Sequence, residues 1–130
     1  MNAELTLRKI CPDFDDWPNR WQIMPEDRQS GRELLAVLEL FCEDLIRSGL
    51  AKNTILRHLT NAWLLGGELI GTVNEDETLR NCPAIELILK YVDEKGGPYS
   101  RHLESGAERN AFDATCRKLH KFLRKEKRSE

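Results

Sequence analysis

Apolar residues recur along this chain with a helical period. From Pro25 to Arg47 they stand three or four positions apart, which predicts one long helix with a broad buried face. Gly49 just beyond Arg47 is a conventional helix stop. A second helix is expected from Lys52 to about Ile70. Its two apolar stripes are Ile55, Leu59, Ala62, Gly66 and Leu69, and Leu56, Trp63 and Ile70.

Further helices follow in the C-terminal half. Asn74, followed by the acidic residues 75–77, predicts an N-cap and first turn of a short helix. Pro83 is expected to start the next helix, and Ser105 with Glu108 has the spacing of a capping box that opens the last one. The last helix carries an apolar face of Ala111, Phe112, Thr115, Cys116, Leu119, Phe122 and Leu123. Almost no segment alternates with period two, so we expect an all-α, single-domain bundle of four to five helices over residues 26–130.

Residues 1–25 have a different character. Pro12, Pro18 and Pro25 interrupt the segment, and proline cannot donate a backbone hydrogen bond. An irregular, extended or turn-like N-terminal arm is therefore predicted. Trp17 and Trp21 are expected to dock it onto the bundle, although the two rings are also candidates for a binding surface.

Gly66 and Gly67 lie inside the second predicted helix, where each glycine costs roughly 1 kcal/mol relative to alanine. A kink, a helix that ends at Gly66, or a neighbouring helix that crosses too closely for a side chain would each explain the pair. We favour the close crossing.

Residues 34–70 read LLAVLELFCEDLIRSGLAKNTILRHLTNAWLLGGELI. This segment resembles the start of the SAM-like core-binding domain of tyrosine recombinases and phage integrases. In that family a helix ends in a Gly-Leu turn, and a short polar cap and a Thr then open a DNA-facing helix. The resemblance extends over about residues 28–126 and implies a domain that binds double-stranded DNA. Ala51 departs from the family, which usually has Ser there, and so does His58, where an aromatic residue is common.

By position, the resemblance assigns DNA contacts to six residues of the second helix. These are Lys52, Asn53, Thr54, Arg57, His58 and Asn61. Arg57 and Asn61 are four residues apart, hence on one helix face, and are the candidates for base edges in a major groove. The alternative is an ordinary solvated polar face.

The last helix adds a basic stripe. Arg117, Lys121, Arg124 and Arg128 follow at helical spacing, opposite the apolar face, and Lys118, Lys125 and Lys127 lie between them. Such a stripe suits contacts to several phosphates. Favourable placement of cations at a helix C-terminus, together with solubility, is the alternative explanation.

The overall charge limits how such a protein would bind DNA. The 130 residues are 32% charged, but the net charge is only −2, so any nucleic-acid contact must be local rather than driven by bulk charge. Acidic residues gather at 13–16 and 75–77, away from the basic stripe. This dipolar distribution suits a DNA-facing side or a protein partner.

No motif for catalysis is evident. The chain has no phosphate-binding loop and no His-x-x-Arg of the recombinase catalytic domain, and its only tyrosines are Tyr91 and Tyr99. The four cysteines, Cys11, Cys42, Cys82 and Cys116, lack metal-ligand spacing, and we expect them to be reduced and buried. Without an export signal or a membrane span, a cytoplasmic protein is expected, with no cofactor, metal or evident small-molecule substrate.

The sequence thus leads to two hypotheses. The first is a non-catalytic DNA-binding module with an accessory or regulatory role, or a remnant of a mobile element. The alternative is a helical protein–protein interaction domain that uses the tryptophan arm or the dipolar surface and has no nucleic-acid role.

Overall fold

Helices account for all the regular structure in the described part of the chain, which confirms the predicted all-α class. The computed structural model describes residues 5–128, with the backbone alone for residues 127 and 128. Its α-helices are α1 (Leu7–Ile10), α2 (Trp17–Trp21), α3 (Asp27–Arg47), α4 (Lys52–Glu75), α5 (Ala84–Tyr91) and α6 (Gly106–Arg128). Two short 3-10 helices, Phe14–Asp16 and Glu77–Asn81, complete the set. The count exceeds the predicted four to five because the N-terminal arm forms short helices of its own.

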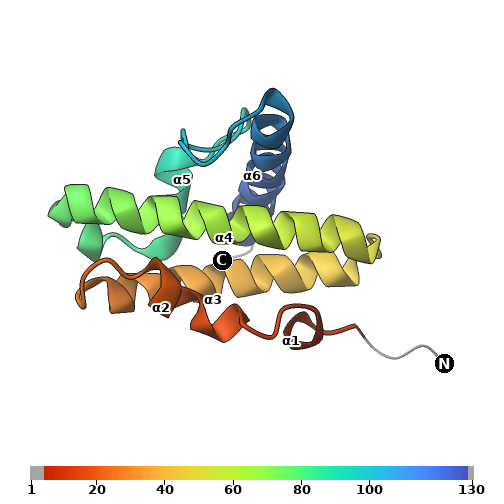
Figure 1. Cartoon of the computed structure of the whole chain (residues 1–130), viewed down its shortest axis with the longest axis horizontal. Coiled ribbons are helices and arrows are strands. Elements are labelled where there is room, and N and C mark those ends of the chain that lie inside the picture. Colours follow the sequence, from red (N-terminus) through yellow and green to blue (C-terminus); the bar gives the residue numbers. More distant parts are fainter. Residues whose placement is uncertain (1–4, 129–130) are drawn as a thin grey trace.

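Helices α3 and α4 form an antiparallel pair at the centre of the molecule (Figure 1). The turn between them depends on Gly49, whose φ of +80° is a left-handed conformation that glycine adopts without steric cost. The predicted end of the first long helix at Arg47 is confirmed. Helix α6 crosses this pair and packs on it, with the rings of Phe41 and Phe122 5.8 Å apart between centroids.

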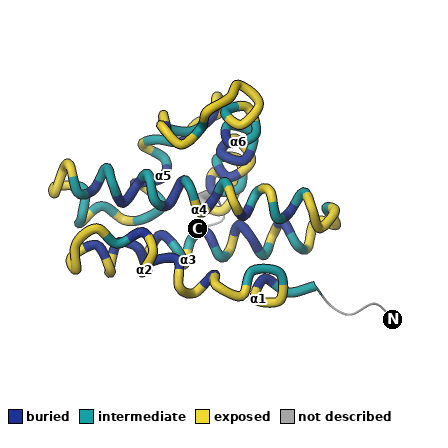
Figure 2. Tube along the Cα trace, viewed as in Figure 1, coloured by how far each residue is buried: buried dark blue, intermediate teal, exposed yellow. Residues whose placement is uncertain are grey.

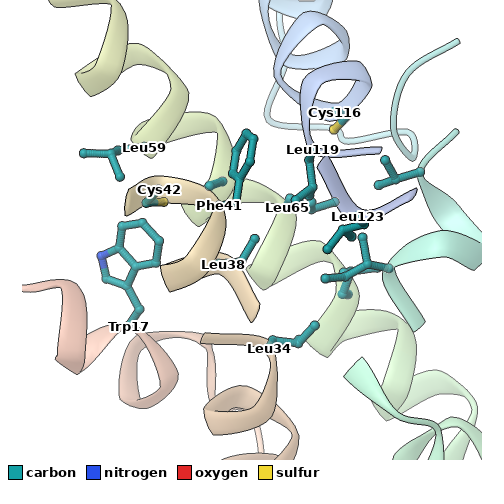
Figure 3. Close-up of a cluster of buried hydrophobic side chains, with 14 of the residues drawn as sticks. Trp17, Leu34, Leu38, Phe41, Cys42, Leu59, Leu65, Cys116, Leu119 and Leu123 are labelled. Carbon is teal, nitrogen blue, oxygen red and sulfur yellow. The ribbon is translucent and has the colours of Figure 1, made fainter. Parts of the chain in front are cut away.

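The core lies between these three helices. Each presents its buried positions inward and its exposed positions outward (Figure 2). Figure 3 shows part of this cluster: Leu34, Leu38, Phe41 and Cys42 from α3, Leu59 and Leu65 from α4, and Cys116, Leu119 and Leu123 from α6. Helix α5, which begins directly after Pro83 as predicted, adds Leu87 and Ile88.

The arm is helical rather than extended, which corrects the prediction. Thr6 caps α1 by accepting a hydrogen bond from the Lys9 amide, and Pro18 occupies the first turn of α2, where its missing N–H is not needed. Trp17 and Trp21 are only 3% and 5% exposed, so the predicted docking of both rings onto the bundle is confirmed.

Trp21 also explains the glycine pair. Helix α4 runs without interruption through Gly66 to Glu75, so the helix does not end there. The indole of Trp21 lies where a side chain at Gly66 would stand, and its Nε1 donates a hydrogen bond of 2.9 Å to the carbonyl of Trp63. Close packing at Gly66 is therefore confirmed, but the neighbour is the Trp21 ring at the end of the short helix α2 and not the body of a crossing helix, which corrects the prediction.

One predicted cap is wrong and one is confirmed. Asn74 lies inside α4, where its amide donates a 2.6 Å hydrogen bond to Asp27 instead of capping a new helix. Asp76 caps the following 3-10 helix by accepting from the Thr78 amide. The capping box is confirmed, because the Glu108 amide donates to Ser105 Oγ and the Ser105 amide donates to Glu108 Oε1, each at 3.1 Å.

Candidate nucleic-acid interface

A buried hydroxyl fixes how α4 packs against α6. Thr115 is 2% exposed, and its Oγ1 accepts a 2.9 Å hydrogen bond from Asn61 Nδ2 and lies 2.7 Å from His58 Nδ1. Asn61 Nδ2 also lies 3.2 Å from the carbonyl oxygen of Ala111. Buried polar groups are costly unless paired, so this network selects one rotation of α6 about its axis.

The same network sets the register of the two helices. Asn61 meets Ala111 and Thr115, whereas His58, one turn earlier in α4, meets Thr115 alone. Residues nearer the start of α4 therefore contact residues nearer the end of α6. Lys118 lies one turn beyond Thr115, and its charge and that of Arg57 both act on the His58 ring.

His58 sits at the centre of this contact. Its imidazole is half-buried, and burial, then the positive charges of Lys118 and Arg57, lower its pKa below the ordinary value of histidine. The ring is therefore neutral at neutral pH, and positive charges face it from both helices.

The lowered pKa of His58 predicts a pH-dependent stability. The unfolded chain binds this proton more readily than the folded chain, so the free energy of unfolding should fall as pH drops from about 8 to about 5.5. His58→Gln should flatten this fall, as measured by urea denaturation at several pH values. His102→Gln, at an exposed histidine, is the matched control. A His58→Gln curve as steep as that of the parent protein would contradict the assignment.

Exposed cations of α4 and α6 lie on both sides of His58. We use the name α4–α6 cationic surface for Arg57 and Lys118, whose charges both act on the His58 ring, together with Lys121, three residues further along α6. Each is exposed, and within the described residues none has a carboxylate within 4.0 Å. By contrast, Arg8 and Arg20 of the arm are paired with Asp15 and Asp16. Uncompensated positive charge is thus present on both α4 and α6, although the net charge of the whole chain is −2.

Asn53 and Thr54 flank this surface at the start of α4, and the first turn of that helix contains no acidic residue. Lys52 stands five residues before Arg57. At about 100° per residue, this spacing directs it away from Arg57 around the helix. Of the predicted second-helix residues, Arg57, His58 and Asn61 are brought together with α6, whereas Lys52 is not.

The predicted basic stripe of α6 divides between two directions. Arg117 turns toward the loop after α5, with a guanidinium nitrogen 3.5 Å from the carbonyl oxygen of Lys95. Lys121 and Arg124 are both exposed further along α6. The side chain of Arg128 lies outside the described residues. The predicted stripe did not include Lys118. The proximity of Lys118 to His58 depends on Thr115 facing α4, and helical spacing alone does not show it.

The cysteines offer little reactivity. All four thiols are free; Cys42 and Cys116 are buried as predicted, but Cys11 and Cys82 are only partly buried, which corrects the prediction. Burial raises the pKa of Cys42 and of Cys116 to about 12 and that of Cys11 to about 11. The thiols of Cys11, Cys42 and Cys116 are therefore protonated and poorly nucleophilic at neutral pH.

Among the described residues, no cluster of His, Cys, Asp or Glu side chains is arranged to hold a metal ion. None of the described helices combines the length and apolar character needed to cross a membrane. Comparison of the chain with protein-family models, curated proteins and solved structures found no match in any of the three.

Proposed function

We propose that this chain is a non-catalytic module that binds double-stranded DNA through the α4–α6 cationic surface. The observation that carries the proposal is that Arg57 and Lys118, from helices far apart in sequence, both lie near His58. Neither these two cations nor Lys121, three residues beyond Lys118 on α6, has a compensating carboxylate among the described residues. The resemblance of residues 34–70 to the recombinase core-binding domain points in the same direction. An accessory or regulatory role, or descent from a mobile element, fits a module without catalytic residues.

The proposed contacts are mainly to phosphates. Asn61 and His58, the polar residues nearest the surface, direct their hydrogen bonds into the contact with α6. A base contact by Asn61 would require breaking its bond to Thr115. Arg57 remains exposed and is the residue best placed to reach a base edge. We therefore expect weak sequence preference and strong salt dependence.

Charge reversal at Lys118 and Lys121 tests the proposal. A fluorescent duplex should bind the parent protein at low salt and dissociate as salt rises, as measured by fluorescence anisotropy. The double variant Lys118→Glu/Lys121→Glu should bind at least about tenfold more weakly, with a salt slope reduced by about two, because two phosphate contacts are lost. The loss should be similar for duplexes of different sequence.

A second double variant controls for the change in net charge. Arg32→Glu/Lys90→Glu reverses two exposed cations on α3 and α5 and changes the total charge by the same amount. This variant should retain most of the affinity. Equal losses of affinity in both double variants would show that binding depends only on the net charge of the protein. Unchanged affinity in the Lys118/Lys121 variant would show that this surface does not contact DNA.

The alternative, a protein-interaction domain without a nucleic-acid role, relied partly on the tryptophan arm. Trp17 and Trp21 are both in the core, so their rings do not form an exposed contact surface. The dipolar charge distribution still suits a protein partner. Anisotropy that does not change with any duplex, even at low salt, would favour this alternative.

A further inference from the structure

An open groove of about 870 Å³ follows the C-terminal half of α4. Its floor includes Trp63, Leu64 and Gly71, the last of which has open space where a Cβ would stand. One wall is the end of the arm, around Ile23, and the other is the segment after α5, around Tyr99. We call it the Trp63–Tyr99 groove.

Exposed apolar side chains concentrate in this groove. Five large hydrophobic residues are exposed among the described residues, and three of them line the groove: Ile23 at 63%, Trp63 at 40% and Tyr99 at 81%. Exposed aromatic rings gathered in one hollow commonly mark a contact site. A ligand with flat, apolar units is therefore indicated.

The wall that carries Tyr99 is held in place by hydrogen bonds. Arg109 of α6 donates to the carbonyl oxygens of Gly97 and Pro98, each at 2.7 Å, and the Ser100 hydroxyl donates to Glu68 of α4 at 2.8 Å. The ring of Tyr99 thus projects from a fixed backbone, which lowers the entropy lost on binding.

The charges around the groove fit nucleotides. Arg101 stands on the wall that carries Tyr99, and Arg20, which is paired with Asp16, stands on the other, whereas the carboxylates in the lining, Glu68 and Glu75, belong to α4. Cations on the walls suit phosphates, and carboxylates between them can accept hydrogen bonds from the amino groups of bases. Exposed aromatic rings flanked by cations are the usual features that bind single-stranded nucleic acid.

The groove lies along the same face of α4 as Arg57. Arg57, Leu64 and Gly71 are spaced seven residues apart and so lie along one face of α4. At a rise of about 1.5 Å per residue, Leu64 follows Arg57 by roughly 10 Å along the helix. A nucleic acid held at Arg57 can therefore extend directly into the groove.

We propose that the Trp63–Tyr99 groove binds unpaired nucleotides, so that the preferred ligand is a duplex with a single-stranded end rather than a blunt duplex. This inference rests on the proposed function, because the paired part of the ligand occupies the α4–α6 cationic surface. Tyr99 and Trp63 stack on the bases, and Arg101 contacts the phosphate backbone.

The test compares a blunt duplex, the same duplex with an oligothymidine overhang, and free oligothymidine, by anisotropy at one salt concentration. The overhang should tighten binding about tenfold. Tyr99→Ala should remove most of this gain and leave the affinity for the blunt duplex unchanged, because the side chain is exposed and outside the core. Tyr99→Phe, which keeps the stacking ring, should retain the gain, and Leu40→Ala, at an exposed residue of α3, is the matched control.

The possible outcomes separate this inference from the proposed function. Equal affinity for blunt and overhanging duplexes, or a gain that persists in Tyr99→Ala, overturns the groove assignment while duplex binding stands. Binding of free oligothymidine that depends on Tyr99, without duplex binding, supports the groove and overturns the proposed function. A change in Trp63 fluorescence with an acidic amphipathic peptide, and none with oligothymidine, assigns the groove to a protein partner and overturns the inference.

Discussion

Gly66→Ala is expected to destabilise the fold by about 3 kcal/mol, although alanine is the better helix former. A Cβ at this position would overlap the six-membered ring of Trp21, and a ring in the core has little room to move. Displacement of the indole would also break its hydrogen bond to the carbonyl of Trp63. The loss from overpacking and from the exposed indole, typically about 1–4 kcal/mol, outweighs the gain of about 1 kcal/mol in helix propensity.

Gly71→Ala provides the control on the same helix. No atom lies within 4 Å of a Cβ built there, so only the gain in helix propensity remains. This variant should be more stable than the parent by up to about 1 kcal/mol. Urea denaturation of both variants measures the difference. Similar effects at Gly66 and Gly71 would show that Trp21 does not occupy the position assigned to it.

Asp27→Ala is the second change with a large expected effect, because Asp27 joins three separate segments. Its carboxylate is 1% exposed, accepts hydrogen bonds of 2.9 and 2.8 Å from the amides of Ile23 and Met24, and pairs with Arg80 at 2.8 Å. Asn74 of α4 donates to the same carboxylate. Removal leaves a largely buried guanidinium and several donors unpaired, which typically costs about 3–5 kcal/mol.

The comparison variant is Asp44→Ala, which removes an exposed carboxylate 3.9 Å from Arg47 on the same helix. Exposed pairs of this kind contribute little, so its denaturation midpoint should stay close to that of the parent. An Asp27→Ala protein as stable as Asp44→Ala would contradict the structural role of Asp27.

Asp27 should also influence stability in acid. Burial alone would raise its pKa, but the hydrogen bonds from Met24, Asn74 and Ile23 and the pairing with Arg80 together lower it. A carboxyl group whose pKa is lowered on folding stabilises the protein above its unfolded value, about 3.9, and this contribution is lost as pH falls through the folded pKa. The stability difference between the parent and Asp27→Asn should therefore shrink below about pH 4.

The N-terminal arm therefore contributes both to the core and to the Trp63–Tyr99 groove. Trp21 fills the space that Gly66 leaves open, and the same segment forms one wall of the Trp63–Tyr99 groove. A Gly66→Ala variant that remains folded should lose the gain from a single-stranded overhang, because displacement of the indole alters that wall.

The helices and their buried faces could be predicted from local patterns. The periodicity of α3, α4 and α6, the turn at Gly49, the start of α5 after Pro83 and the capping box at Ser105 each depend on residues within a few positions of one another. The arm was harder to predict, because three prolines indicated an extended segment. Proline is compatible with the first turn of a helix, and the contacts of the two tryptophans with the bundle favour short helices there.

By itself, the sequence determined that this protein is all-α, where its long helices lie, which of their faces are buried, and that its tryptophan arm docks. Tertiary structure alone decided that Thr115 meets His58 and Asn61, that Lys118 lies near His58 while Arg117 turns away, and that Trp21 fills the space at Gly66. The reason is physical: helical periodicity is a property of neighbouring residues, whereas the rotation of one helix against another depends on the packing of side chains far apart in sequence.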